Sequence, residues 1–140
     1  MISFNVKKLA AGAKLPTKDN SADAGIDVYT NETYTLNAGE THLFSTGIAT
    51  EFSKGYVALL WDRSGLGSKG IHRLAGVIDS GYRGEWKVAL VNLTKKAFEI
   101  KAGDKVIQCV LQKFEGVKIK EVQELKESKR GGRGFGSSGR

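Results

Sequence analysis

Two groups that can take part in acid–base and stacking chemistry, Asp79 and Tyr82, stand three residues apart directly after the apolar run 75–78. Such a run is typical of a strand, and a strand that ends in a carboxylate can aim that group at a pocket. Small turn residues between 80 and 84, followed by a second apolar run, predict a β-hairpin across 74–92. An aspartate in an ordinary turn has the same local pattern, so the other polar residues must decide between the two interpretations.

A second group of residues has the chemistry of an anion site. Segment 63–70 holds glycines that let backbone N–H groups approach an anion. Ser64 adds a hydroxyl donor, and Arg63 and Lys69 add positive charge. The spacing differs from that of a P-loop, so a basic surface turn is the alternative. Gln108, in a later apolar run, needs either backbone partners or a ligand phosphate, because an unpaired buried amide costs about 1–3 kcal/mol.

One acidic residue, Asp27, interrupts the otherwise apolar run 24–28. A carboxylate in this setting either points to solvent or faces a bound cation. Magnesium keeps much of its hydration shell in protein sites, so we expect any contact between Asp27 and a magnesium ion to pass through water.

The C-terminal residues 127–140 differ in composition from the rest of the chain, with glycine, serine, arginine and lysine around one aromatic ring, Phe135. Such a segment cannot build a core, so we expect a β-domain over 1–126 followed by a flexible arm. Arginine, glycine and phenylalanine together are typical of segments that bind single-stranded nucleic acid. The alternative is a lid, with Phe135 over a base and Arg130 on phosphates.

Length and charge restrict the class of protein. The chain has 140 residues and a formal net charge of +7, which fits one domain with a polyanionic partner such as a nucleotide or nucleic acid. The single cysteine, Cys109, lies in an apolar run, so we expect a buried thiol and no disulfide. No Cys/His cluster has metal-ligand spacing, no apolar run is long enough to cross a bilayer, and no signal peptide is recognisable. We therefore expect a cytoplasmic protein, or one of the host cytoplasm if viral, without a membrane partner.

Hydrophobic alternation and turn residues predict an all-β fold. Turn signals recur about every ten residues, and no long helical periodicity interrupts them. Short strands at this spacing indicate a β-sandwich or barrel, with at most one short helical turn, within 64–70. The expected strands are 2–6, 25–30, 32–36, 41–50, 55–61, 97–100, 104–113 and 117–122.

Five segments, in this order along the chain, resemble the trimeric dUTPase family (dUTP nucleotidohydrolases, or dUTP pyrophosphatases). The third and fifth segments are the most specific. The segments are Ala24-Gly25-Ile26-Asp27-Val28; Arg63-Ser64-Gly65-Leu66; Gly76-Val77-Ile78-Asp79 with Tyr82-Arg83-Gly84; Gly103-Asp104-Lys105-Val106-Ile107-Gln108; and Arg130 with Gly134-Phe135-Gly136-Ser137-Ser138-Gly139.

The resemblance implies a jelly-roll-like β-barrel or sandwich that assembles as a homotrimer. Its active sites would lie at the subunit junctions, with each C-terminal arm exchanged onto a neighbour. The implied enzyme, a dUTP diphosphatase, converts dUTP and water into dUMP and pyrophosphate, with Mg²⁺ on the triphosphate. In the cell this reaction limits uracil in DNA and supplies dUMP for thymidylate synthesis.

The family's functional residues map onto this chain residue by residue. Asp79 resembles the general base that activates the attacking water, a role worth roughly 10²–10⁴-fold in rate. Tyr82 resembles the residue whose ring lies under the deoxyribose and excludes a 2′-hydroxyl, and Phe135 resembles the ring that stacks on uracil. Asp27 would hold magnesium-bound water. The residues implied to contact uracil are Gly76, Val77 and Ile78, and those implied to contact the phosphates are Arg63, Ser64, Gly65, Lys87, Gln108, Arg130, Gly136, Ser137 and Ser138.

Three residues depart from the family's pattern. Asp62 stands where many members have proline, Arg73 where several bacterial members have an asparagine that faces uracil, and Arg133 where the arm has a small residue. These departures change the charge near the implied phosphate and uracil sites and leave the implied general base unchanged.

Two alternatives compete with this interpretation. The related dCTP deaminases, some of which also cleave the triphosphate, carry a catalytic glutamate and a serine-arginine motif that this sequence lacks. A nucleic-acid-binding β-domain with an RGG-like arm explains the charge but leaves Asp79 and Tyr82 without roles. A nucleic-acid partner is therefore not expected.

Overall fold

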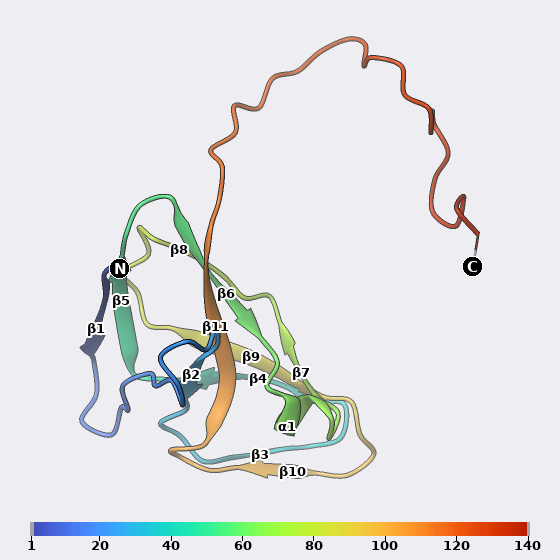
Figure 1. The fold of residues 1–140 in the computed structure, drawn as a ribbon. Helices are drawn as coiled ribbons and strands as arrows, with labels where there is room; N and C mark the ends of the chain where they lie inside the picture. The colour runs from blue at the N-terminus through green and yellow to red at the C-terminus, as the bar shows by residue number, and fades with distance from the viewer. Residues whose placement is uncertain (1, 140) are drawn as a thin grey trace.

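The computed structural model describes residues 2–139, which form an all-β body with one helical turn and a long C-terminal extension (Figure 1). The all-β prediction is confirmed, and the expected helical turn is α1 (Ser64–Gly67). The strands are β1 (Phe4–Lys8), β2 (Ile26–Tyr29), β3 (Tyr34–Leu36), β4 (Thr41–Ser45), β5 (Ile48–Phe52), β6 (Tyr56–Trp61), β7 (Ile71–Leu74), β8 (Val77–Asp79), β9 (Lys87–Asn92), β10 (Phe98–Ile100) and β11 (Lys105–Lys113).

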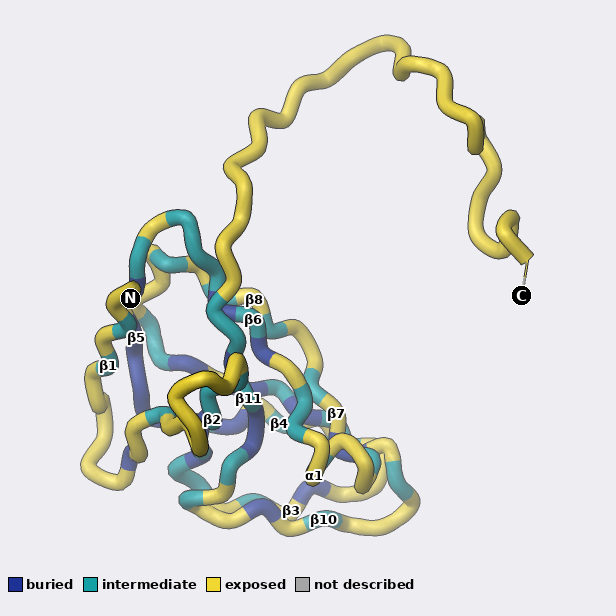
Figure 2. The backbone as a smooth tube through the Cα atoms, viewed as in Figure 1, coloured by how far each residue is buried: buried dark blue, intermediate teal, exposed yellow. Residues whose placement is uncertain are grey.

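Antiparallel pairing divides these strands into four sheets. In the largest sheet, β6 lies between β11 on one edge and β8 on the other, and β2 continues the sheet beyond β11. A second sheet has β9 between β4 and β7, and two-stranded sheets join β1 to β5 and β3 to β10. All four sheets contribute buried side chains to one apolar core, which is dark blue in Figure 2.

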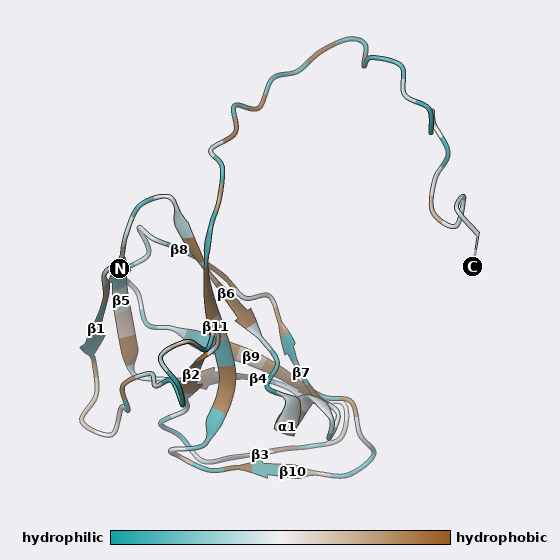
Figure 3. Ribbon diagram, in the orientation of Figure 1, coloured by the Kyte–Doolittle hydropathy of each residue, from teal (hydrophilic) through white to brown (hydrophobic). Residues whose placement is uncertain are grey.

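Strand β9 shows how sequence alternation builds this core. Val88, Leu90 and Asn92 are buried at alternate positions, as expected for a strand with one face inward. Trp86, just before the strand, is fully buried, and its ring N–H donates to Thr50 Oγ1 over 2.9 Å. This hydrogen bond lets a large aromatic ring fill the core without an unpaired polar atom. Figure 3 shows the hydrophobic stretches of β6 and β11 in the same body.

The prediction of a β-hairpin across 74–92 is wrong. Strand β8 pairs with β6, whereas β9 pairs with β7 and β4 in a different sheet. The chain passes from one sheet to the other at Ala75 and Gly76, whose φ angles are 59° and 119°. A local turn pattern does not reveal which distant strand a segment pairs with. The prediction also missed β7.

Two further strand predictions need correction. Segment 41–50 is not one strand, because the chain bends at Gly47, whose φ of 68° favours glycine, and continues as β5. Segment 117–122 forms no strand, and Ile119 within it is 92% exposed. The alternation that predicted a strand is present there, but no other strand of the described chain pairs with it.

The chain leaves the body after β11 (Figure 1). Residues 114–139 are exposed throughout and appear yellow in Figure 2. The expected division between 1–126 and 127–140 stays a prediction, since both of its sides lie in this same exposed segment.

Asn92 is a buried, hydrogen-bonded polar residue in the core, and its replacement should lower the stability of the fold. Its Nδ2 donates to the carbonyls of Leu36 and Lys96 over 2.9 and 2.7 Å. Its Oδ1 accepts from the N–H and the hydroxyl of Thr94 over 2.9 and 2.7 Å. We expect Asn92→Ala to lower the free energy of unfolding by about 1–3 kcal/mol, because these groups lose their partner in a buried site. Urea denaturation measures this loss, and an equal loss in the exposed control Asn5→Ala would contradict it.

Candidate active site

A pocket of about 500 Å³ lies between β8 and the start of β9. Strand β8 is the edge of its sheet, so the side facing away from β6 pairs with no strand of residues 2–139. Its backbone N–H and C=O groups on that side are free to bind a ligand. The predicted site residues in the lining are Gly76, Val77, Ile78, Asp79, Tyr82 and Lys87, and the other lining residues are Leu43, Leu60, Ala75, Glu85 and Trp86.

A tight turn holds Asp79 and Tyr82 at one wall of this pocket. Asp79 is the exposed last residue of β8, and its carbonyl accepts from the Tyr82 N–H over 3.0 Å. The Tyr82 hydroxyl donates to the Glu85 carbonyl over 2.9 Å, which folds the ring back across the turn. A Cβ at Gly84 would lie 2.6 Å from Cζ of that ring, so this position needs glycine. The turn therefore brings together the carboxylate and the phenol that the sequence singled out.

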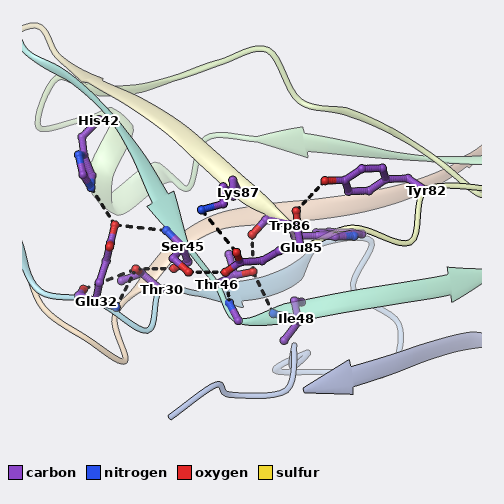
Figure 4. A network of polar contacts seen from close by, with 11 residues as sticks. Thr30, Glu32, His42, Ser45, Thr46, Ile48, Tyr82, Glu85, Trp86 and Lys87 are labelled. Carbon is purple, nitrogen blue, oxygen red and sulfur yellow. Dashed lines mark hydrogen bonds and ion pairs between the residues drawn. The ribbon is translucent and has the colours of Figure 1, made fainter. Parts of the chain in front are cut away.

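Glu85 connects the pocket to the end of β4 and to the bend that follows it (Figure 4). Its Oε1 accepts hydrogen bonds from the Ser45 hydroxyl and, over 2.9 Å, from the Gly47 N–H. Its Oε2 is 3.4 Å from Lys87 Nζ, so an ion pair holds Lys87 at the pocket. The Ser45 hydrogen bond, helped by Gly47 and Lys87, lowers the pKa of Glu85. The sequence prediction missed Glu85, because a glutamate between glycine and tryptophan carries no motif.

A second pocket, of about 190 Å³, gathers predicted phosphate-binding residues. Asp27 makes two ion pairs at this pocket. Its Oδ1 accepts a hydrogen bond from Arg63 Nε over 2.7 Å, and its Oδ2 is 2.6 Å from Lys105 Nζ. The hydrogen bond with Asp27 raises the pKa of Lys105, a residue that the sequence prediction did not select. Ser64, the first residue of α1, stands beside this ion-paired group. The lining consists of Asp19, Asp23, Gly25, Asp27, Arg63, Ser64 and Gln108.

Gln108 has a backbone partner in this structure. Its Nε2 donates to the Asp62 carbonyl over 2.7 Å, which supports the segment that leads into Ser64. A Cβ at Gly25 would lie 2.4 Å from Gln108 Oε1, so a larger residue there would have to displace the amide. The backbone alternative is therefore observed, and a phosphate contact through the second amide hydrogen stays a prediction.

A magnesium ion fits the second pocket through its hydration shell. Among residues 2–139, no group of three or more His, Cys, Asp or Glu side chains is arranged to hold a metal ion. Both oxygens of Asp27 already interact with a cation, from Arg63 and Lys105, and each oxygen has a second lone pair. Asp27 can therefore accept a hydrogen bond from a metal-bound water through one of these lone pairs.

The two pockets lie apart within one chain. Asp79 in β8 pairs with Val57, and Gln108 in β11 pairs with Trp61, at opposite ends and on opposite edges of β6. At about 3.3 Å per residue along a strand and about 4.8 Å between strands, the Cα atoms of Asp79 and Gln108 are roughly 16 Å apart. One chain therefore presents two separate groups of predicted site residues.

The predicted arm residues line neither pocket. The extension runs away from the body in Figure 1, and Phe135 is fully exposed. Arg130 Nη2 donates to the Gly134 carbonyl over 3.1 Å and to Ser137 Oγ over 3.3 Å, within the arm itself. Within one chain, the structure therefore does not bring the predicted arm residues to the predicted site residues of either pocket. These arm residues are Arg130, Phe135, Gly136, Ser137 and Ser138.

The remaining predictions concern the thiol and the membrane. Cys109 is fully buried, and burial raises its pKa to about 12, so it is an unreactive core residue as predicted. Within residues 2–139, no helix has both the length and the hydrophobicity that a membrane span requires.

Known proteins resemble this chain over nearly its whole length. The family model described as dUTPase matches residues 11–139. A relative from Nocardia farcinica, named deoxyuridine 5′-triphosphate nucleotidohydrolase, is 40% identical over 138 residues, which cover 96% of this chain and 84% of the relative.

Solved structures share the fold. The dUTPase of Staphylococcus bacteriophage 80alpha, solved with dUPNHPP, matches with a TM-score of 0.90 at 29% identity and covers 99% of each chain. A mutant dUTPase of phage phi11 of S. aureus, whose description names a structural Mg(II) ion, matches with a TM-score of 0.82 at 27% identity, over 89% of this chain and 99% of that one. The predicted jelly-roll-like fold class is confirmed by these likenesses.

Glu85 should make the stability of the fold depend on pH. The Ser45 hydrogen bond lowers its folded-state pKa below the ordinary 4.5, so its contribution is present above pH 4.5 and is lost as the pH falls through the lower folded value. We expect Glu85→Gln to lower the free energy of unfolding near neutral pH by about 1 kcal/mol and to weaken the loss of stability in acid. Urea denaturation at several pH values measures both effects, with the exposed Glu124→Gln as control. An unchanged pH profile in Glu85→Gln would show that this carboxylate does not stabilise the fold.

Proposed function

The chain belongs to the dUTPase family, and we propose that it hydrolyses dUTP to dUMP and pyrophosphate. The observation that carries this proposal is the pocket beside β8, where Asp79 and Tyr82 stand next to a free backbone edge. In a cell this reaction limits uracil in DNA and supplies dUMP for thymidylate synthesis. A location in the cytoplasm, or the host cytoplasm for a viral enzyme, is part of the same proposal. The family match supports neither a dCTP deaminase nor a nucleic-acid-binding domain.

The free edge of β8 suits a uracil base. Uracil presents an N–H between two carbonyl oxygens, which complements the alternating C=O and N–H groups of a strand edge. The Gly76 carbonyl accepts from the Leu60 N–H over 2.8 Å, so we assign uracil to the backbone groups of 76–78 that face away from β6. The Tyr82 ring at the same pocket supports a sugar-selecting role, because a ring packed against the deoxyribose leaves no room for a 2′-hydroxyl.

Asp79 carries the chemical step in this proposal. Its carboxylate takes a proton from a water molecule, and the water oxygen forms a bond to the α-phosphorus. The bond between that phosphorus and the bridging oxygen breaks, and its electron pair leaves with pyrophosphate. The exposed position of Asp79 at the end of β8 supports this role, and the nearby Lys87 cation can contact the phosphates.

The second pocket is proposed to bind the phosphate chain. Arg63 and Ser64 offer a guanidinium and a hydroxyl, the Gly65 backbone N–H is the adjacent donor, and Gln108 adds an amide hydrogen. Magnesium on the triphosphate neutralises charge and polarises the phosphoryl oxygens when bound. Asp27 would hold a water of its hydration shell. The Mg(II) ion named for the phage phi11 enzyme supports a role for this metal.

A homotrimer would complete the site with residues from neighbouring chains. Val77 pairs with Leu59, and Asp79 pairs with Val57, which is nearer the start of β6. A nucleotide with its base at Val77 and its α-phosphate at Asp79 therefore runs toward the start of β6. Gln108 pairs at the opposite end of β6. The phosphates of such a nucleotide point away from the second pocket of the same chain. This register supports a site in which another subunit supplies that pocket.

The exposed extension is proposed to close over a neighbour's pocket. The 22 residues from 114 to 135 can span at most about 75 Å, which is ample for reaching another subunit. Phe135 would stack on uracil and Arg130 would reach the γ-phosphate, with Gly136, Ser137 and Ser138 on the phosphates. Closure would exclude water and strengthen the electrostatic contacts beneath the arm.

Pyrophosphate release from dUTP tests the proposed function directly. We expect hydrolysis of dUTP in strong preference to UTP, dTTP and dCTP, and a loss of rate when magnesium is chelated. Ammonia release from dCTP would instead support a deaminase. No hydrolysis of any of these nucleotides would contradict the proposal.

Asp79→Asn should remove the base while preserving the shape of the turn. We expect kcat to fall by about 10²–10⁴-fold with little change in the affinity for dUMP. Steady-state kinetics and calorimetric binding of dUMP measure the two effects. Turnover near that of the unaltered chain would remove Asp79 from the role of base.

Mixed trimers test whether the arm acts on a neighbouring chain. Asp79→Asn chains and chains lacking 130–140 should each be nearly inactive alone. Trimers assembled jointly from both should regain part of the activity, because some sites then combine an intact Asp79 with an intact arm. No recovery, although native mass spectrometry shows mixed trimers, would mean that each arm serves the site of its own chain.

A further inference from the structure

Arg73 contacts the turn at residues 75–76. Its Nη1 donates to the Ala75 carbonyl over 2.6 Å, and its Cδ lies 3.6 Å from the position that a Cβ on Gly76 would take. Ala75 and Gly76 line the pocket, whereas Arg73 does not. Its hydrogen bond to Ala75 can therefore act on a ligand through the turn.

The turn at 75–76 has a backbone that needs support. Ala75 has a φ of 59°, and it is the non-glycine residue with a positive φ among residues 2–139. This left-handed conformation is disfavoured for an L-residue with a side chain. Gly76 has a φ of 119°, and a Cβ there would lie 2.9 Å from Leu60 Cβ. A disfavoured turn of this kind persists where surrounding contacts hold it.

The contacts around Arg73 can supply that support. Its guanidinium carbon lies 4.9 Å from the centre of the Trp61 ring, which places a flat cation against an aromatic face. Its backbone N–H donates to Asp62 Oδ1 over 2.8 Å, and Asp62 Oδ2 is 2.5 Å from His72 Nδ1. Trp61 therefore restrains the guanidinium, while Asp62 restrains the backbone of β7.

The burial of one Arg73 atom is unfavourable. Its Nε is buried and has no hydrogen-bond partner among the described residues. An unpaired buried donor is unfavourable, so the remaining contacts of the side chain must outweigh this loss. The hydrogen bond to Ala75 and the Trp61 contact are the interactions that fix its direction.

We propose that Arg73 is a positioning residue for base recognition, which holds the turn at 75–76 so that the adjacent edge of β8 presents its backbone groups to uracil. A planar guanidinium can lie on a ring and donate a hydrogen bond from its edge at the same time, whereas an ammonium group is a point charge. Arg73 acts on the binding of the base and not on the breaking bond. The inference rests on the proposed function.

The test compares Arg73→Met and Arg73→Lys with the unaltered chain, with Lys8→Ala on β1 as an exposed cationic control. We expect Arg73→Met to raise KM for dUTP about 10-fold with kcat nearly unchanged, the size expected for loss of one positioning hydrogen bond to a charged group. The Kd of dUMP should rise by the same factor, and the preference for dUTP over dTTP should narrow. Arg73→Lys, which keeps the charge and a donor, should give a smaller increase, and the control should give none.

An unchanged KM and an unchanged ratio of dUTP to dTTP hydrolysis in both Arg73 variants would overturn the inference. A lower Tm with unchanged KM would also overturn it, because that result describes a purely structural residue. If Arg73→Met does not fold, two other variants test the inference by their KM for dUTP. These are Arg73→Lys and Trp61→Leu, the second of which removes the ring against the guanidinium. Failure of the proposed function is distinct, since the unaltered chain itself would then fail to hydrolyse dUTP.

Discussion

The pairing of β6 on both of its edges is the constraint on which the site depends. One edge holds β8, which ends in Asp79, and the other holds β11, which carries Gln108. Because Asp79 and Gln108 pair near opposite ends of β6, the pocket beside β8 and the pocket around Asp27 in one chain cannot be brought together without breaking the sheet. The core behind β6 fixes this separation, since Ala58 and Leu60 are buried in it. In the proposed function, an assembly of chains overcomes this separation.

The carboxylates near the two pockets differ in their ion pairing, which supports different proposed roles for them. Asp27 is ion-paired with Arg63 and Lys105, and Glu85 is ion-paired with Lys87, so each of these carboxylates orients cations that can meet a phosphate chain. Asp79 is different, because it is exposed at the end of a strand and ion-paired with no cation of residues 2–139. Ion pairing and exposure thus distinguish three chemically similar side chains, and the proposed function assigns the base to the unpaired one.

Local patterns in the sequence were enough for the all-β class, the helical turn at Ser64 and the meeting of Asp79 with Tyr82, because period-two alternation and turn chemistry act between near neighbours. Pairing partners were not predictable, and the expected hairpin failed because β8 and β9 join different sheets. The pattern at 117–122 suits a strand but has no partner within the described chain. Glu85 and Lys105 gain their importance only from distant contacts, with Ser45 and Asp27 respectively.

The most direct measurement of the shared site is a crystal structure of the full chain with a non-hydrolysable dUTP analogue and magnesium. The predicted result is a nucleotide whose uracil lies against β8 and whose α-phosphate lies beside Asp79 of one chain, while its phosphates contact Ser64 and Gln108 of another. A nucleotide bound to Asp79, Ser64 and Gln108 of one and the same chain would contradict the account.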